Sequence, residues 1–211
     1  MNNNRFYLAV MFSFFLLQSV GISKDENNYP IILVHGFMGW GRDEMAGYRY
    51  WGGKFDIEEY LTENGFEVYT TSIGPVSSNW DRAIELFYQI KGGQVDYGKA
   101  HSDKFGITQK PSVKKFPGLY PEWDSDHPIH LIGHSMGGQT VRMLLYQLTH
   151  SIYSDSLDII LEESDLLGEE HSDWVRSITS ISTPHDCLTA HLRRLTERSP
   201  TQQRISVAAA A

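Results

Sequence analysis

The sequence of 211 residues has a single cysteine, Cys187, and few basic side chains. One cysteine excludes an internal disulfide framework and any zinc module built from several cysteines. The 18 Lys and Arg residues against 26 Asp and Glu give a formal net charge of -8. Nucleic-acid binding is therefore a poor interpretation, because contacts with phosphates require clustered cations. Hydrophobic residues make up 41% of the chain, which excludes a disordered chain and suits one domain.

The longest apolar run is too short to cross a membrane. It covers residues 6–17, about 12 residues, whereas a membrane-spanning helix needs roughly 20. Arg5 precedes this run, and small residues follow it before charge resumes at Lys24, which is the layout of a secretory signal peptide. We therefore expect residues 1–23 to be removed and the protein to be secreted, with a membrane anchor as the alternative.

Apolar runs alternate along the chain with helix-capping residues, which include Asp56 and Ser78. Strands are expected at residues 31–34, 68–73, 128–132 and 178–181, and helices at 56–64, 80–91 and 136–148. Residues 94–128 are expected to form an ordered loop. The acidic segment 151–173 is expected to be a solvated surface helix with an apolar stripe at Leu157, Ile160 and Leu161. This alternation predicts an α/β fold with a mostly parallel sheet flanked by helices.

The decisive motif is Gly133-His134-Ser135-Met136-Gly137, which lies between an expected strand and an expected amphipathic helix. In that context the motif is typical of a nucleophile elbow, a strained turn that presents the serine oxygen at the edge of a sheet. Its glycines let strand and helix approach closely, and the helix N-terminus directs free N–H groups at developing oxyanion charge. Ser135 is therefore the candidate catalytic nucleophile; the alternative is an ordinary strand–helix turn.

A second motif, His35-Gly36-Phe37, ends the first expected strand. In α/β-hydrolases a turn at this point supplies one oxyanion N–H, and the residue after the nucleophile supplies the other. The candidate oxyanion donors are therefore the backbone N–H groups of Phe37 and Met136. The alternative for His35 is a buried histidine that satisfies loop carbonyls, and the two interpretations are compatible.

Characteristic stretches occur in order at residues 30–37, 39–42, 50–53, 77–83, 92–101, 133–143 and 182–186. They resemble the N-terminal half of the large secreted lipases of the staphylococcal and thermophilic bacillus type. The resemblance covers residues 29–186 and implies an α/β-hydrolase fold. It also implies hydrolysis of carboxylic esters, with triacylglycerols as the substrate class, at a lipid–water interface.

The resembled family also carries a zinc site of two Asp and two His, which suits the preference of zinc for four ligands. The resemblance makes Asp81 and His101 two of these ligands. A third position holds Ile107, which cannot bind metal, so the site is expected to be incomplete. His127 or Asp103 could substitute, although no spacing favours either, and the alternative leaves Asp81 as a helix-start charge. The ester chemistry itself requires no cofactor.

The residues after Ser135 supply no convincing acid or base for a triad, in which the acid and then the histidine follow the serine. His150 and His171 lie too close to the elbow helix and the acidic segment. His185 belongs to a turn that is outside the triad in the resembled family. The sequence therefore predicts little esterase turnover from this chain.

The resemblance ends at Asp186, and residues 187–211 form a tail of different composition. This break suggests a frameshift or a truncated gene, so residues 24–186 are expected to be the N-terminal part of an α/β-hydrolase domain with a truncated sheet. The leading interpretation is a secreted ester hydrolase of the triacylglycerol lipase type. The alternatives are a lipid acyltransferase of the same fold and a catalytically dead fragment that binds lipid or a partner.

Overall fold

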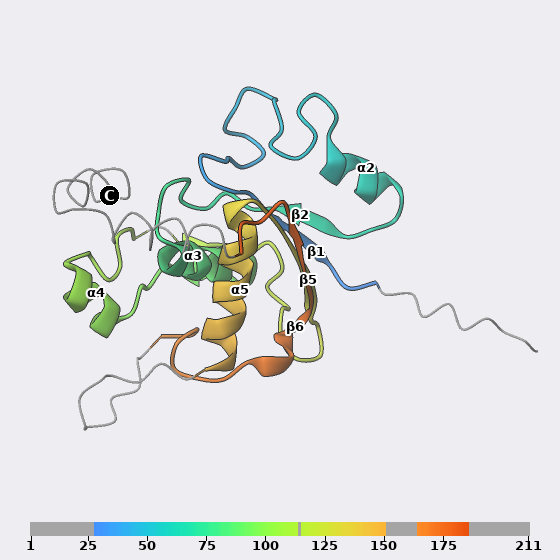
Figure 1. Cartoon of the computed structure of the whole chain (residues 1–211). Coiled ribbons are helices and arrows are strands. Elements are labelled where there is room, and N and C mark those ends of the chain that lie inside the picture. The colour runs from blue at the N-terminus through green and yellow to red at the C-terminus, as the bar shows by residue number, and fades with distance from the viewer. Residues whose placement is uncertain (1–27, 114, 151–163, 186–211) are drawn as a thin grey trace, which may run out of the picture.

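A four-stranded parallel sheet forms the centre of the protein, whose computed structural model describes residues 28–113, 115–150 and 164–185. The strands lie in the order β2-β1-β5-β6. Their bounds are Ile31–Val34 for β1, Val68–Thr70 for β2, Ile129–His134 for β5 and Val175–Ile181 for β6. Helices α3 (Asn79–Lys91) and α5 (Met136–Thr149) lie on one face of this sheet (Figure 1). The predicted α/β architecture is confirmed.

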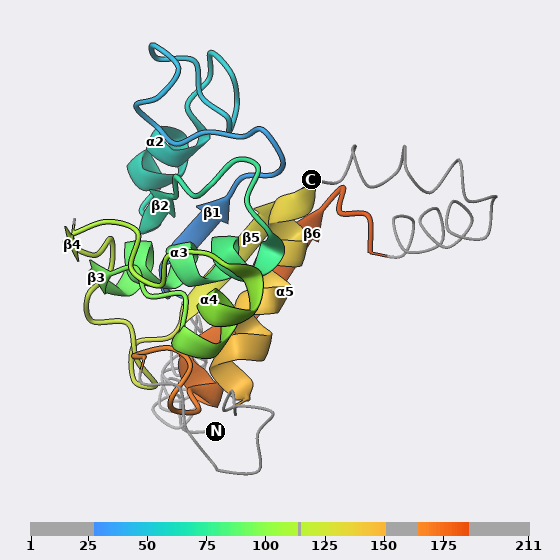
Figure 2. The ribbon, with the colours of Figure 1, turned by 90° about the vertical axis from the view of Figure 1, so that its left-hand side faces the viewer.

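The parallel register brings the carboxyl ends of the strands to one edge of the sheet. Leu33 of β1 pairs with Ile132 of β5, and Ile132 is in register with Thr179 of β6. The segments that follow β1 and β5 therefore lie beside each other at this edge, where open α/β sheets place their ligands. In the rotated view, the loop after β1 lies above the N-terminal end of α5 (Figure 2).

The predicted capping residues begin the helices. Asp56 accepts a hydrogen bond of 3.1 Å from the N–H of Glu59 at the start of α2 (Ile57–Glu63). Ser78 accepts from the N–H of Asp81 at 3.1 Å and donates to its carboxylate at 2.8 Å, at the start of α3. Each cap satisfies one of the donors that the first helical turn leaves free.

The core lies between the sheet and the two helices on its face. Buried side chains of α3 and α5, such as Phe87 and Leu144, pack with Ile32 of β1 and Leu131 of β5. Trp123, which is fully buried, donates its indole N–H to the carbonyl of Trp174 at 2.8 Å. Burial of this apolar surface is the main driving force for folding.

The expected loop at residues 94–128 contains secondary structure that the sequence analysis missed. It includes helix α4 (Lys99–Phe105) and an antiparallel pair between β3 (Gly93–Gln94) and β4 (Lys115–Phe116). Helix α4 has 7 residues and no side-chain N-cap, so it leaves neither a capping signal nor enough turns for a periodic pattern. The second expected strand is also shorter than predicted, because it ends at Thr70.

The acidic segment is only partly described. Residues 151–163, which hold the expected apolar stripe, lie outside the described residues, as do residues 1–23 and 187–211. Residues 164–171 form turns rather than the predicted solvated helix, and Leu166 and Leu167 within them are fully buried. A 3-10 turn, η1 (Ser172–Trp174), then leads into β6. No helix within the described ranges is long and apolar enough to cross a membrane.

Candidate active site

Ser135 occupies the turn between β5 and α5, as the elbow interpretation predicts. Its backbone has φ 54 and ψ -124, a combination that side-chain-bearing residues rarely adopt. The surrounding backbone holds this strained residue, because its N–H donates to the Ile181 carbonyl at 2.9 Å and its carbonyl accepts from the Gly138 N–H at 3.1 Å. The turn at Ser135 therefore has the strained backbone that a nucleophile elbow requires.

The glycines of the motif are required by close backbone approach. A Cβ atom added to Gly133 would lie 2.4 Å from the carbonyl carbon of Gly137. One added to Gly137 would lie 2.3 Å from the carbonyl oxygen of Val34 in β1. These neighbours are main-chain atoms, so no side-chain rotation relieves either overlap.

The turn after β1 lies directly against the elbow. A Cβ atom on Gly36 would stand 2.8 Å from the Cβ of Ser135, so the two backbones nearly touch. Phe37 follows Gly36 in this turn and Met136 follows Ser135 in the elbow, so the two candidate oxyanion donors belong to segments that are in contact. Neither N–H donates to another residue in the described part of the chain. The structure thus brings together the three residues that sequence reasoning assigned to the ester chemistry, although their roles stay predictions.

His35 orients the peptide that carries the Phe37 N–H. The N–H of Ile73 donates to Nε2 of His35 at 3.2 Å, so Nδ1 carries the proton and donates to the Gly36 carbonyl at 2.9 Å. That carbonyl also accepts from the Gly39 N–H at 3.1 Å. Because the C=O and N–H of a trans peptide point in opposite directions, these two bonds direct the Phe37 N–H away from His35 and Gly39. Burial lowers the pKa of His35, which keeps the ring neutral.

A buried arginine ties the loops after β1 and β2 to α5. Arg82 donates to the carbonyls of His35 at 2.6 Å and Gly74 at 2.5 Å, and to Oγ1 of Thr140 at 3.0 Å. Its side chain is fully buried, and burial lowers the pKa of the guanidinium to about 10. In the described ranges it forms no ion pair with a carboxylate, although the negative charge of nearby Glu85 favours the charged guanidinium. Sequence reasoning missed this contact, which joins segments far apart in the chain.

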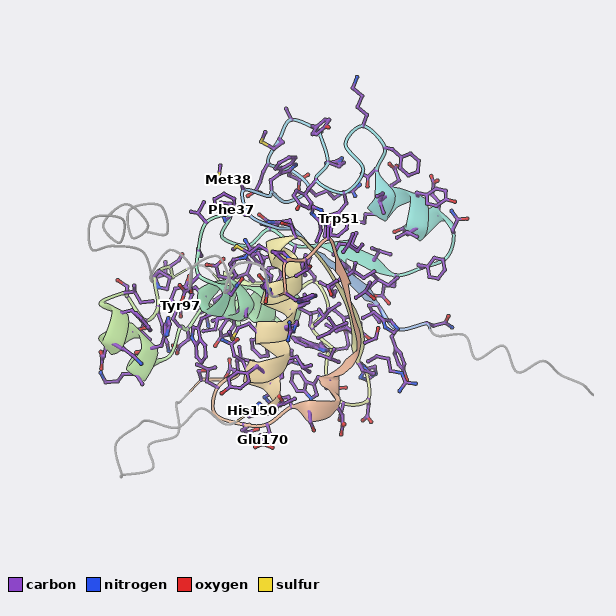
Figure 3. All side chains as sticks on the ribbon, in the orientation of Figure 1. Phe37, Met38, Trp51, Tyr97, His150 and Glu170 are labelled. Carbon is purple, nitrogen blue, oxygen red and sulfur yellow. The ribbon has the colours of Figure 1, made fainter. Side chains whose placement is uncertain are left out.

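The histidines that the structure describes are bonded elsewhere than at Ser135. His185 donates from Nε2 to Oγ of Ser180 at 3.0 Å, and its Nδ1 accepts from Arg142 at 2.8 Å. His150 lies at the opposite end of the molecule from Phe37 (Figure 3), and the ring of His171 packs on Trp174. The Ser135 hydroxyl has no hydrogen bond to a histidine within the described ranges.

The two zinc ligands implied by the resemblance lie side by side. Nε2 of His101 is 2.9 Å from Oδ1 of Asp81, and the His101 ring stacks on Trp80 at 5.3 Å. Asp103 pairs instead with Lys99, and His127 pairs with Asp124. Among the described residues no third His, Cys, Asp or Glu joins a group that could hold a metal ion. This part of the chain therefore does not fit a four-ligand zinc site.

An aromatic pocket lies beside the elbow, on the His134 side. It has a volume of about 310 Å³ and is open to solvent. Its walls include the side chains of Trp40, Tyr48, Tyr50, Trp51 and His134. The sequence analysis did not place these aromatics near Ser135, because no local pattern encodes a contact with β5.

A protein family described as "Lipase-like, C-terminal domain" matches residues 27–199 of the sequence. The chain belongs to this family.

Curated relatives of this lipase-like chain are staphylococcal lipases. A lipase of Staphylococcus epidermidis is 45% identical over 168 residues, covering 76% of this chain and 24% of the relative. A lipase of Staphylococcus hyicus is 40% identical over 169 residues, covering 76% of this chain and 26% of the relative. The lipase-like chain thus spans about a quarter of the length of the curated relatives that it matches.

Solved structures agree with the lipase-like assignment. EstA from Clostridium botulinum has a TM-score of 0.69 at 50% identity, covering 75% of this chain and 36% of that one. Lipase 1 from Pelosinus fermentans has a TM-score of 0.67 at 47% identity, covering 79% and 45%. For Staphylococcus hyicus lipase the TM-score is 0.68 at 36% identity, covering 87% and 48%. The parallel sheet and its flanking helices therefore form part of an α/β-hydrolase-like fold, as the resemblance implied.

Proposed function

We propose that this chain carries the serine and oxyanion half of a secreted carboxylic-ester hydrolase acting on lipid esters. One observation supports the proposal: the strained Ser135 lies against the turn that holds Phe37. In the described part of the chain the N–H groups of Phe37 and Met136 bond to no other residue, so a candidate nucleophile and two candidate oxyanion donors lie at one edge of the sheet. A carbonyl attacked by the serine oxygen would develop negative charge where these N–H groups can stabilise it. Secretion is inferred from the signal-peptide layout of residues 1–23.

Exposed apolar side chains around this edge support a lipid substrate class. Phe37 and Met38 are 61% and 59% exposed, and Val76 in the neighbouring loop is 64% exposed. The N–H of Met38 donates to the Pro75 carbonyl at 2.9 Å, which keeps the two loops together. Apolar side chains gathered beside a reactive centre favour contact with acyl chains or with a lipid–water interface.

The test combines covalent labelling with ester hydrolysis. A fluorophosphonate probe is expected to label the wild-type protein slowly and the Ser135→Ala variant not at all, because the oxyanion N–H groups favour attack by Ser135 although no described histidine activates it. Hydrolysis of p-nitrophenyl butyrate is expected to be slow, since no described histidine forms a hydrogen bond with the Ser135 hydroxyl, and to fall further in Ser135→Ala.

Two results would count against the proposal. Equal labelling of wild type and Ser135→Ala would indicate a catalytically dead binding fragment. Transfer of the acyl group to an added lipid alcohol in preference to water would indicate an acyltransferase.

A further inference from the structure

We propose that Tyr50 is a positioning residue whose hydroxyl holds the turn of residues 36–39 against the nucleophile elbow. The inference rests on the function proposed above, because it concerns the same oxyanion donors. The observation behind it is that a single phenolic oxygen contacts both Gly36 and His134, and His134 lies 84 residues beyond Tyr50 in sequence.

The Tyr50 hydroxyl joins the residue before one oxyanion donor to the residue before the nucleophile. Its oxygen accepts from the N–H of Gly36 at 2.9 Å and lies 2.5 Å from Nδ1 of His134. Because the oxygen already accepts from Gly36, its own proton is free to go to His134, which then accepts on an unprotonated Nδ1. The hydroxyl therefore links the 36–39 turn to the last residue of β5.

The aromatic ring of Tyr50 is itself held in place. It packs edge-to-face against Trp40 at 5.4 Å and against Trp51 at 5.8 Å, and it also contacts the rings of His35 and His134. These contacts leave the ring little freedom, so the hydroxyl presents a fixed acceptor to Gly36. A ring held in this way orders the turn before any substrate binds.

The two peptides around Gly36 are held by different side chains. His35 and the Gly39 N–H bind the carbonyl of the peptide that carries the Phe37 N–H. Tyr50 binds the N–H of the preceding peptide, which is buried. Without the hydroxyl, that buried N–H loses its acceptor, and the turn has to shift to find another. The Phe37 N–H moves with it, away from the position in which it would meet the oxyanion.

The test compares Tyr50→Phe, which removes only the hydroxyl, with Tyr48→Phe. Tyr48 lines the same pocket, and its hydroxyl makes no hydrogen bond to another described residue. Hydrogen exchange of the Gly36 amide, followed by NMR, is expected to accelerate about tenfold or more in Tyr50→Phe and to stay unchanged in Tyr48→Phe. Unchanged exchange in folded Tyr50→Phe would overturn the proposal.

The kinetic readout separates positioning from substrate binding. In Tyr50→Phe, kcat for p-nitrophenyl butyrate is expected to fall about tenfold with little change in KM, less than the roughly 100-fold loss when an oxyanion donor is removed. A rise in KM at constant kcat would contradict positioning and make Tyr50 a substrate contact. If the wild-type protein showed no reaction that depends on Ser135, the proposed function would be rejected. Hydrogen exchange of the Gly36 amide would still decide the role of Tyr50.

The tautomer of His134 in the wild-type protein tests the same hydrogen bond if Tyr50→Phe fails to fold. Because the hydroxyl donates to Nδ1, neutral His134 must carry its proton on Nε2, and the nitrogen chemical shifts of the ring report this tautomer. A proton on Nδ1 would only reverse the direction of this bond, whereas a ring whose Nδ1 shift shows no hydrogen bond would refute the link. With folded variants, the effects of Tyr50→Phe and His134→Gln on Gly36 exchange are expected to be non-additive, since both remove the same link, and additive effects would refute it.

Discussion

Replacing the buried Arg82 by lysine is expected to destabilise the protein strongly. The guanidinium donates to two carbonyls and one hydroxyl on three separate segments, and hydrogen bonds to a charged group contribute about 1.5–3 kcal/mol each. An ammonium is a single point, so Arg82→Lys keeps the charge but reaches one of the three acceptors. The loss of two such bonds predicts a decrease of about 3–6 kcal/mol in the free energy of unfolding.

Urea denaturation followed by tryptophan fluorescence measures this loss, because Trp123 is buried in the core. With a slope of about 2 kcal/mol per M, the midpoint is expected to fall by about 1.5 M or more. The control is Arg176→Lys on the exposed side of β6, which is expected to change stability by no more than about 0.5 kcal/mol. If Arg82→Lys lost less than about 1 kcal/mol, the argument that Arg82 joins the three segments would be wrong.

Three further outcomes follow from the site. Gly137→Ala is expected to lower the free energy of unfolding by at least about 2 kcal/mol, because the new Cβ would overlap the Val34 carbonyl. The variant is also expected to lose labelling of Ser135, and labelling at the wild-type level would contradict this. Since burial lowers the folded-state pKa of His35, stability is expected to be highest above about pH 6.5 and to fall as the pH drops toward the folded pKa. Urea midpoints from pH 8 to pH 5 measure that fall, and His35→Gln should reduce it. Zinc should be lost on dialysis against a chelator, because Asp81 and His101 are the only two of the expected ligands that meet among the described residues. Retention of about one zinc per chain would reveal a further ligand.

The parts of the fold that the sequence predicted correctly are those encoded by neighbouring residues. The caps Asp56 and Ser78 act on N–H groups three residues ahead, and the apolar run at residues 31–34 needs no distant partner to be identified as a strand. Helix α4 was missed because it lacks a side-chain cap, and the buried Leu166 was misjudged because an acidic neighbourhood obscured its apolar role.

The residues of the candidate site also differ in whether the sequence could predict them. The elbow could be predicted because its steric requirements fall on residues close to Ser135 in sequence. Gly133 and Gly137 lie on either side of Ser135, and any side chain at either position would overlap main-chain atoms. The groups that orient this turn could not be predicted, because Tyr50 and Arg82 act on main-chain atoms of distant segments, and a main-chain atom gives no signal in sequence.

This difference has a consequence for substitutions at the site. A change in the elbow glycines introduces overlap and should damage folding and labelling together, as argued for Gly137. Loss of the Tyr50 hydroxyl introduces no overlap, because the ring keeps its packing against Trp40 and Trp51. It removes only the acceptor of the Gly36 N–H, so it should weaken the reaction while leaving most of the stability in place. The ratio of the loss in reaction rate to the loss in stability therefore distinguishes residues that form the turn from residues that only orient it.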